Sequence, residues 1–233
     1  DEVEVLDGPT GPTLSLNPGR VEARSPAYAE NPALGFEGTR KPLAAQFTFN
    51  GETVFLVNVH FKSKSGDDPL FGASQPPFQD TLAQRVNQAE LVNELVEDIL
   101  AKDPAAKIIV LGDTNDFDFS ETLKALADRE LENLVARLPA EDRYTFVFDG
   151  NSQVLDTVLV SRSLAGGAEI DIVHGNADRG PAFWSSDHDP VLARFEFGSP
   201  IRADLLGRIV PPDGEPVPGG AEIVAASPRA PAA

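Results

Sequence analysis

Hydrophobic and polar positions follow strand-like and helix-like patterns from residue 43 onward. The runs 43–49 and 53–61 flank Asn50-Gly51, and two strand-like runs around Asn-Gly are the strongest short-range signal for a β-hairpin. The second run is apolar on both faces as far as Val57, which is typical of a central strand in a two-layer sandwich. The pattern therefore predicts a hairpin whose second strand is buried on both sides.

A long helix is predicted to follow a polar loop over residues 62–79. Apolar residues recur at alternating spacings of four and three, which places them on one helix face: Leu82, Val86, Ala89, Val92, Val96 and Ile99. Asp80 or Thr81 caps this helix, and Asp103-Pro104 ends it. A loop as long as 62–79 inside a compact domain is usually functional or disordered.

The rest of the patterned sequence predicts mostly strands. A buried strand over 107–113 runs into a turn, and Ser120 begins a shorter helix that ends near Arg129. Further strands are expected over 144–148, 154–161, 169–174 and 191–197, with a break at Asp149-Gly150. Strands with helices between them predict an α/β fold, a mixed sandwich with helices outside two packed sheets.

Proline and glycine divide the chain into three parts. Residues 1–42 are rich in both and predict an irregular segment that belongs to the domain, residues 43–200 carry its core, and residues 201–233 predict a linker or disordered tail. No apolar run is long enough to span a bilayer, and no signal peptide is visible. Because the chain has no methionine, we expect it to be a processed or excised fragment.

The net charge of −18 limits how the protein can bind a polyanion. A protein that holds nucleic acid by charge alone should be basic, because neutralising phosphates provides most of the non-specific affinity. If the substrate is polyanionic, a divalent cation and a few local lysines and arginines must offset the repulsion. The absence of cysteine excludes disulfides and thiolate metal sites.

Candidate chemistry lies where the predicted strands begin or end. His60 ends a buried strand, and Asp113 and Asn115, two residues apart after another strand, fall on one side of extended backbone. Asp156 lies among apolar residues, and a buried carboxylate requires a partner, for which histidine is a natural choice. Asp187-His188-Asp189 places an imidazole between two carboxylates just before the last strand.

Each motif alone also has an ordinary structural explanation. These are a strand-end histidine, an Asx turn, a buried hydrogen-bond acceptor and a solvated turn, respectively. The motifs in this order, each at the edge of a core strand, favour a phosphoester-hydrolysing site. His174 ends another strand without such neighbours, and we expect it to be structural or solvent-facing.

The series His60-Phe-Lys-Ser, Gly112-Asp-Thr-Asn, Leu155-Asp-Thr-Val-Leu and Ser186-Asp-His-Asp-Pro resembles the endonuclease/exonuclease/phosphatase superfamily. This superfamily includes pancreatic-type deoxyribonuclease and the abasic-site endonucleases. The stretches 38–47, 66–72 and 143–152 are similar to those of large bacterial extracellular nucleases, and the resemblance covers about residues 8–197.

The resemblance implies a four-layered α/β-sandwich that is incomplete at its N-terminus. Residues 43–200 would form the C-terminal two-thirds of the domain. The family's first strands carry a Gln-Glu motif whose glutamate is a principal Mg²⁺ ligand, and residues 1–42 offer no convincing replacement.

The resemblance also implies catalytic roles for the candidate residues. His188 matches the histidine that activates the attacking water or contacts the phosphate, and Asp156 matches the carboxylate that orients it. His60 matches the histidine that stabilises or protonates the leaving oxygen. Asp113 and Asn115 match residues that position the nucleophile, the phosphate or the metal.

Metal and substrate contacts are implied in the same way. Asp187 and Asp113 are the expected metal ligands, and Asn115, Arg40 and Lys62 are the expected substrate contacts, although the sequence favours a solvated surface role for Lys62. The implied cofactor is Mg²⁺, with Ca²⁺ or Mn²⁺ as alternatives.

These residues together predict a metal-dependent phosphodiester hydrolase, an extracellular nuclease that acts on DNA or RNA by in-line attack of water. Nucleic acid is then a substrate, with no membrane and no nucleotide cofactor involved. One alternative is a phosphomonoesterase or phospholipid phosphodiesterase of the same superfamily, which the acidic composition mildly favours. Another is a catalytically incomplete fragment that serves only as a folded or binding module.

Overall fold

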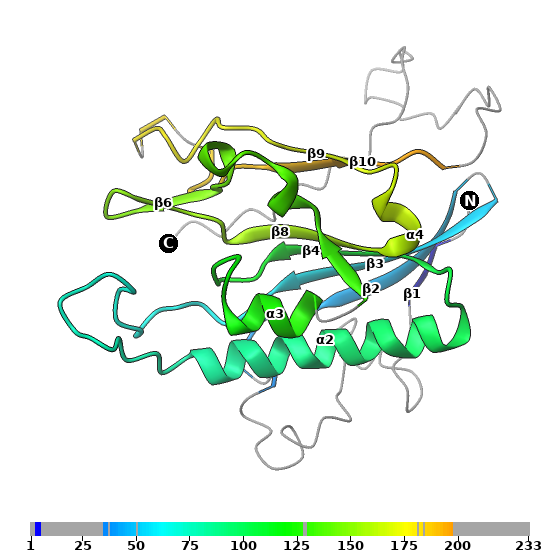
Figure 1. The fold of residues 1–233 in the computed structure, drawn as a ribbon, viewed down its shortest axis with the longest axis horizontal. Helices are drawn as coiled ribbons and strands as arrows, with labels where there is room; N and C mark the ends of the chain where they lie inside the picture. Colours follow the sequence, from blue (N-terminus) through cyan, green and yellow to red (C-terminus); the bar gives the residue numbers. More distant parts are fainter. Residues whose placement is uncertain are drawn as a thin grey trace, which may run out of the picture.

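A computed structural model of the chain describes residues 3–5, 35–36, 38–49, 51–127, 130–180, 182–183 and 185–197. They form a mixed α/β sandwich in which helices cover one face of a large sheet and a small sheet packs on the other face (Figure 1). The predicted fold class is confirmed, and the described residues make up three of the four expected layers.

The large sheet has six strands in the order β1-β2-β3-β4-β8-β5. Only the β3–β4 pair is parallel, because α2 carries the chain back across the sheet between these two strands. The strands are β1 (Val3–Val5), β2 (Leu43–Phe49), β3 (Glu52–His60), β4 (Lys107–Asp113), β8 (Asp156–Ser161) and β5 (Leu131–Asn133).

The predicted hairpin is confirmed as β2 and β3, which pair from Leu43 opposite Asn58 to Phe49 opposite Glu52. Gly51 turns the chain at a φ of 77°, a left-handed conformation that glycine adopts without steric cost. β3 lies between β2 and β4, as its apolar faces predict.

Two smaller pairs of strands complete the β structure. β9 (Glu169–Ile172) pairs with β10 (Val191–Arg194), and β6 (Phe146–Phe148) pairs with β7 (Asn151–Gln153). Asp149 and Gly150, at φ 48° and 78°, form the tight turn between β6 and β7, where the sequence predicts a break.

The two longer helices match the predicted positions, whereas three short helices among the described residues are not predicted by the sequence. α2 spans Leu82–Lys102 with Thr81 as its N-cap, and α3 spans Glu121–Ala127. The short helices are α4 (Arg162–Ala165), η2 (Leu134–Arg137) and η3 (Ala140–Asp142). None of the described helices combines the length and apolar character that a membrane crossing requires.

One prediction needs correction at the N-terminus. Residues 1–42 are predicted to be irregular, yet Val3–Val5 forms β1 on the free edge of β2. The backbone groups of an edge strand are unpaired and accept a further short strand. The predicted tail over 201–233 lies outside the described residues.

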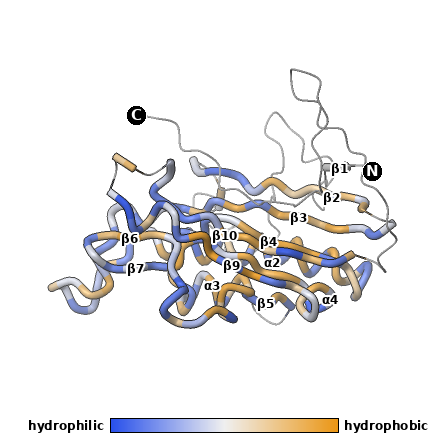
Figure 2. Tube along the Cα trace, turned by 90° about the horizontal axis from the view of Figure 1, so that it is seen from above, coloured by the Kyte–Doolittle hydropathy of each residue, from blue (hydrophilic) through white to orange (hydrophobic). Residues whose placement is uncertain are grey.

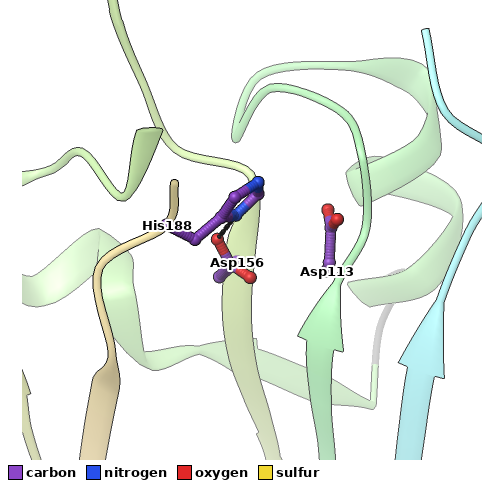
Figure 3. Close-up of side chains that lie close together, drawn as sticks. All are labelled: Asp113, Asp156 and His188. Carbon is purple, nitrogen blue, oxygen red and sulfur yellow. Dashed lines mark hydrogen bonds and ion pairs between the residues drawn. The ribbon is translucent and has the colours of Figure 1, made fainter. Parts of the chain in front are cut away.

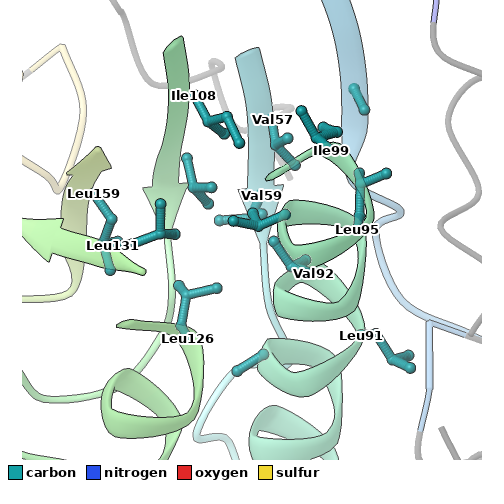
Figure 4. Packing of buried hydrophobic residues seen from close by; sticks show 14 of the residues in the cluster. Val57, Val59, Leu91, Val92, Leu95, Ile99, Ile108, Leu126, Leu131 and Leu159 are labelled. Atoms are coloured by element: carbon teal, nitrogen blue, oxygen red, sulfur yellow. The ribbon is translucent and has the colours of Figure 1, made fainter. Parts of the chain in front are cut away.

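Two apolar cores hold the layers together. The first lies between the large sheet and α2 and α3, where Val57 and Val59 of β3 face Val92, Leu95 and Ile99 of α2 (Figure 4). The second lies between the large sheet and β9–β10 and includes Val158 and Ile172. The central strands of the large sheet are largely hydrophobic along their length, whereas the short strand β7 is hydrophilic (Figure 2).

Candidate active site

The candidate site lies where β3 and β4 end and β8 begins. His60 is paired with Asp113 in the β3–β4 ladder, and Asp113 is paired with Asp156 in the β4–β8 ladder. Side chains of paired residues point to the same face of a sheet, so these three groups form a row across adjacent strands. This is the face that packs against β9–β10, because Ile109 of β4 and Val158 of β8 lie in that core.

Asp156 and His188 form a buried carboxylate–imidazole pair (Figure 3). Asp156 Oδ2 lies 2.5 Å from His188 Nδ1, and the two side chains are 5% and 15% exposed. Burial lowers the pKa of His188, but the hydrogen bond to Asp156 and the nearby carboxylates outweigh it and raise the pKa to about 9. The histidine partner that the burial of Asp156 predicts is thus present, and it is protonated at neutral pH.

Asp113 is held by the turn that follows β4. Its two carboxylate oxygens accept hydrogen bonds from the backbone N–H and the Nδ2 of Asn115, at 2.8 and 3.1 Å. Asn115 Nδ2 also donates to the carbonyl of Phe61, at 3.1 Å. Asn115 adopts a left-handed φ of 52°, which asparagine tolerates better than most residues. Burial and the negative charge of Asp156 raise the pKa of Asp113 above its usual range.

The backbone at Gly112 explains why a glycine precedes Asp113 in the Gly-Asp-Thr-Asn motif. Its φ is 130°, and a Cβ atom there would lie 2.1 Å from the carbonyl oxygen of Val59. Only glycine permits the close approach of β4 to β3 at this point, directly before Asp113.

His60 lies between Arg40 and Asp113. Its Nε2 is 3.0 Å from Arg40 Nη1 and 3.3 Å from Asp113 Oδ2. Because arginine only donates hydrogen bonds, Nε2 of His60 accepts from Arg40 and its proton lies on Nδ1. Burial and the Arg40 cation lower the pKa of His60 to about 4, so this ring is neutral at neutral pH.

The donor atoms of Asp113, Asp156 and His188 lie within 4.8 Å of one another and could hold a metal ion. A protonated imidazole has no lone pair for a metal, so we assign ligation to oxygen atoms. Mg²⁺ prefers oxygen and usually takes one or two carboxylates together with water and substrate phosphate. Asp113 fits this requirement, because a divalent cation would relieve its repulsion by Asp156.

The remaining predicted contacts lie nearby but are less closely tied to this group. Asp187 is exposed beside His188, and its charge contributes to the raised pKa of that histidine. Lys62 is half-buried, and its backbone N–H donates to Gln88 Oε1 at 2.8 Å. The metal-binding role of Asp187 and the substrate-binding roles of Lys62 and Arg40 stay predictions.

His174 belongs to a second carboxylate–imidazole pair that supports the site. Its Nδ1 lies 3.1 Å from Asp189 Oδ2, and its ring stacks on Tyr144 at 4.1 Å. The fully buried Asp189 also accepts the backbone N–H groups of residues 175, 176 and 177. Asn176 Nδ2 in turn donates to the carbonyl of His188 at 2.8 Å, so this pair fixes the turn that carries His188.

Sequence reasoning missed a buried cationic network beneath the Asn115 turn. The Arg85 guanidinium of α2 contacts Asp67 at 2.9 Å and Asp116 at 3.1 Å, and it also binds Thr81 Oγ1. Arg85 therefore joins the loop after β3 to the turn after β4. The signal in the sequence is its position three residues after Leu82 on the apolar face of the helix, where a cation requires buried partners.

Lys64 is a second residue that the sequence motifs did not mark. Its Nζ donates to the carbonyl oxygen of Asn115 at 3.2 Å and lies 4.8 Å from the centre of the Phe117 ring. Burial lowers its pKa to about 8. Lys64 thus adds positive charge near the carboxylates of Asp113 and Asp116 in an acidic protein.

Comparisons with solved structures agree with the fold. Truncated TDP2 from Caenorhabditis elegans matches with a TM-score of 0.50 and 20% identity, over 66% of this chain and 59% of that chain. A second structure of the same protein gives the same TM-score, identity and share of this chain, over 45% of its own length. A mannosyl-6-phosphatase from Bacteroides thetaiotaomicron matches at 0.45 and 19% identity, over 67% of this chain and 57% of its own. This chain thus spans less than two thirds of each of these proteins.

The comparison with curated proteins gives no match. The sequence model of the Endonuclease/Exonuclease/phosphatase family matches residues 22–175, more than half of the chain. Its matched range contains His60, Asp113, Asn115 and Asp156, while His188 follows it. The enzymes in this family's name hydrolyse phosphoester bonds. The chain belongs to the Endonuclease/Exonuclease/phosphatase family.

Proposed function

We propose that this protein is a metal-dependent phosphodiesterase, an extracellular nuclease that acts on DNA or RNA. The observation that carries the proposal is the row formed by His60, Asp113 and Asp156 on adjacent strands, with His188 bound to Asp156. It combines cationic and neutral imidazoles with a carboxylate free to take a metal, as hydrolysis of a phosphodiester requires.

The His188–Asp156 pair supplies a fixed proton donor. Asp156 holds His188 by Nδ1, which leaves Nε2 directed away from the carboxylate. In its protonated form His188 donates to a phosphate oxygen, and it accepts a proton from the attacking water only when deprotonated. The raised pKa of His188 favours the phosphate-binding role in the free protein.

The His60 end of the row, opposite His188, faces the leaving oxygen in this proposal. Neutral His60 is a poor proton donor, so the adjacent Arg40 guanidinium supplies the positive charge there. His60 then serves to orient Arg40 and to polarise the leaving group by hydrogen bonding. Asn115 holds Asp113 in place and keeps its carboxylate oriented toward the row.

Asp113 is the residue that would hold Mg²⁺, with Asp187 as the second expected ligand. The ion would neutralise charge on the phosphate and on the leaving oxygen. Calorimetric titration of Mg²⁺ tests this role directly. Asp113→Asn should weaken binding, while Asp149→Asn, the same change at an exposed turn residue, should leave it unaltered.

The net charge of −18 favours a second candidate, the hydrolysis of small phosphomonoesters or of phospholipids. The two candidates are separated by a panel of plasmid DNA, RNA, a nitrophenyl phosphomonoester and phosphatidylcholine vesicles. Faster cleavage of the nucleic acids supports the nuclease, and turnover of the monoester or the lipid alone supports the alternative.

The decisive experiment compares wild type with His188→Ala in Mg²⁺, Ca²⁺, Mn²⁺ or EDTA. We expect hydrolysis to require the metal and to be lost in the variant while its circular dichroism spectrum is unchanged. Full activity of His188→Ala, or in EDTA, would contradict the proposal. Secretion is part of the proposal, and detection of the protein in the culture medium of its source organism tests it.

A further inference from the structure

Two pairs of stacked phenylalanine rings lead from solvent to the site. On β6, the ring centres of Phe146 and Phe148 are 6.3 Å apart and the rings are inclined by 11°. In the turn after β4, Phe117 and Phe119 are 5.3 Å apart and inclined by 2°. In each pair one ring is half-buried, while the other is exposed, by 53% for Phe148 and 57% for Phe119.

The first pair touches the proposed catalytic imidazole. The ring centre of Phe146 lies 4.8 Å from that of His188, and the two residues also form a backbone bridge. Phe148, two residues further along the strand, extends this stack outward from His188. The three rings make a continuous aromatic surface on the β8 side of the site.

The second pair adjoins the Asp113 side. Phe117 follows Asn115 by two residues, and Lys64 Nζ lies 4.8 Å from its ring centre while donating to the Asn115 carbonyl. Both pairs belong to segments at the end of the large sheet where β3 and β4 finish (Figure 1). The row of catalytic candidates therefore has one stacked pair near Asp113 and another beside His188.

Exposed rings at such a position indicate a ligand with flat apolar faces. A large exposed side chain is costly to solvate, and its recurrence beside a cleavage site marks a binding surface. Within each pair the inner ring fixes the plane of the outer ring, as stacking on a planar group requires. On either side of a phosphodiester in nucleic acid, the planar groups are the bases, and their faces are free only where the strand is unpaired.

We propose that Phe119 and Phe148 are stacking platforms for unpaired bases that flank the cleaved phosphate, so that the preferred substrate is single-stranded nucleic acid. The proposal rests on the proposed phosphodiesterase function and names its substrate class. It also explains how a chain of net charge −18 binds a polyanion. Base stacking on aromatic rings is tolerant of sequence and adds to the affinity that local positive charge supplies.

The test uses a fluorescein-labelled single-stranded oligonucleotide, the duplex of the same sequence, and an abasic oligomer with the same number of phosphates. Binding is measured by fluorescence anisotropy in EDTA, and cleavage is measured separately with Mg²⁺. The variants are Phe119→Ala, Phe148→Ala and the double variant, with Phe119→Trp and Phe148→Tyr as rescues. Phe71→Ala is the matched control, because Phe71 is 83% exposed and belongs to neither pair.

Each alanine variant should weaken binding of the single strand roughly five- to 150-fold, the range for loss of one stacked base. The loss should be similar at low and high salt, the aromatic rescues should restore affinity, and binding of the abasic oligomer and of the duplex should change little. Phe71→Ala should stay within about twofold of wild type by the same measure.

Equal affinity of wild type for the base-containing and abasic strands would overturn the proposal. Loss of binding to phosphatidylcholine vesicles in both alanine variants, while their affinity for the oligonucleotide is unchanged, is the other contrary outcome. That result would assign the rings to a lipid surface. If no oligonucleotide is cleaved, the proposed nuclease function fails, but the anisotropy comparison still decides whether the rings bind bases. If all three are cleaved and bound alike, only the stacking proposal fails.

Discussion

The guanidinium of Arg85 joins the loop after β3 to the turn that carries Asn115. Arg85→Met would remove this charged group and leave an uncharged side chain at the same position of α2. The Arg85 side chain is fully buried, and the carboxylates of Asp67 and Asp116 that it contacts are 4% and 2% exposed. Methionine would leave both carboxylates buried without their cation. Breaking a buried ion pair from one side costs about 3–5 kcal/mol. That is a large part of the roughly 5–15 kcal/mol by which a domain is stable.

Urea unfolding followed by circular dichroism measures this loss. The matched control is Lys124→Met, because the Lys124–Glu121 pair has side chains that are 63% and 68% exposed. An exposed pair contributes at most about 1 kcal/mol. Equal losses in the two variants would refute the reasoning. If Arg85→Met does not fold, Arg85→Lys keeps the charge but loses the planar fork, and its smaller loss remains measurable.

Three further predictions concern the site itself. In Asp156→Asn, His188 loses its hydrogen-bonded carboxylate while burial still lowers its pKa and Asp113 and Asp187 still raise it, so the pKa should fall below about 9, as NMR titration of the imidazoles would show. An unchanged highest pKa would contradict the pairing. Because the pKa of His188 is raised in the folded state, its contribution to stability is full below pH 6.5 and is lost as the pH rises through about 9. Urea unfolding at pH 6.5 and at pH 9 should show this loss in wild type but not in Asp156→Asn. Gly112→Ala should destabilise the fold by at least about 1–3 kcal/mol because of its left-handed φ and the nearby carbonyl of Val59. Gly166→Ala, where no atom lies within 4 Å of the added Cβ, should have little effect, and similar midpoints for the two would contradict the steric argument.

The elements that the sequence predicts well are those long enough to show a period. The helix Leu82–Lys102 and the strands Glu52–His60 and Lys107–Asp113 follow from apolar spacing and turn residues. The three-residue strands Leu131–Asn133 and Asn151–Gln153 escape prediction, because so short a run has no periodicity and depends on the strand beside it.

The meeting of the candidate residues could be predicted from strand order, but their support could not. Parallel strands end at the same edge of a sheet, which brings His60 beside Asp113. Lys64 lies in the loop after β3, and Arg85 of α2 contacts Asp67 of the same loop, whose path depends on tertiary packing. In the sequence alone, a lysine in a polar loop is indistinguishable from a solvated one, and the position of Arg85 on the apolar helix face indicates buried partners without identifying them.

The pairing of β4 with β8 makes the catalytic geometry a property of the main chain. Asp113 and Asp156 are opposite each other in one antiparallel ladder, so hydrogen bonds between peptide groups set the distance between their Cα atoms. Apolar residues elsewhere in the two strands can therefore vary in size without moving the carboxylates apart. A slip of one residue would turn one of the two toward the helices, leaving a sheet with the same strands and no catalytic centre. The hydrolytic activity proposed for this site should thus report on whether these strands have paired in the native alignment.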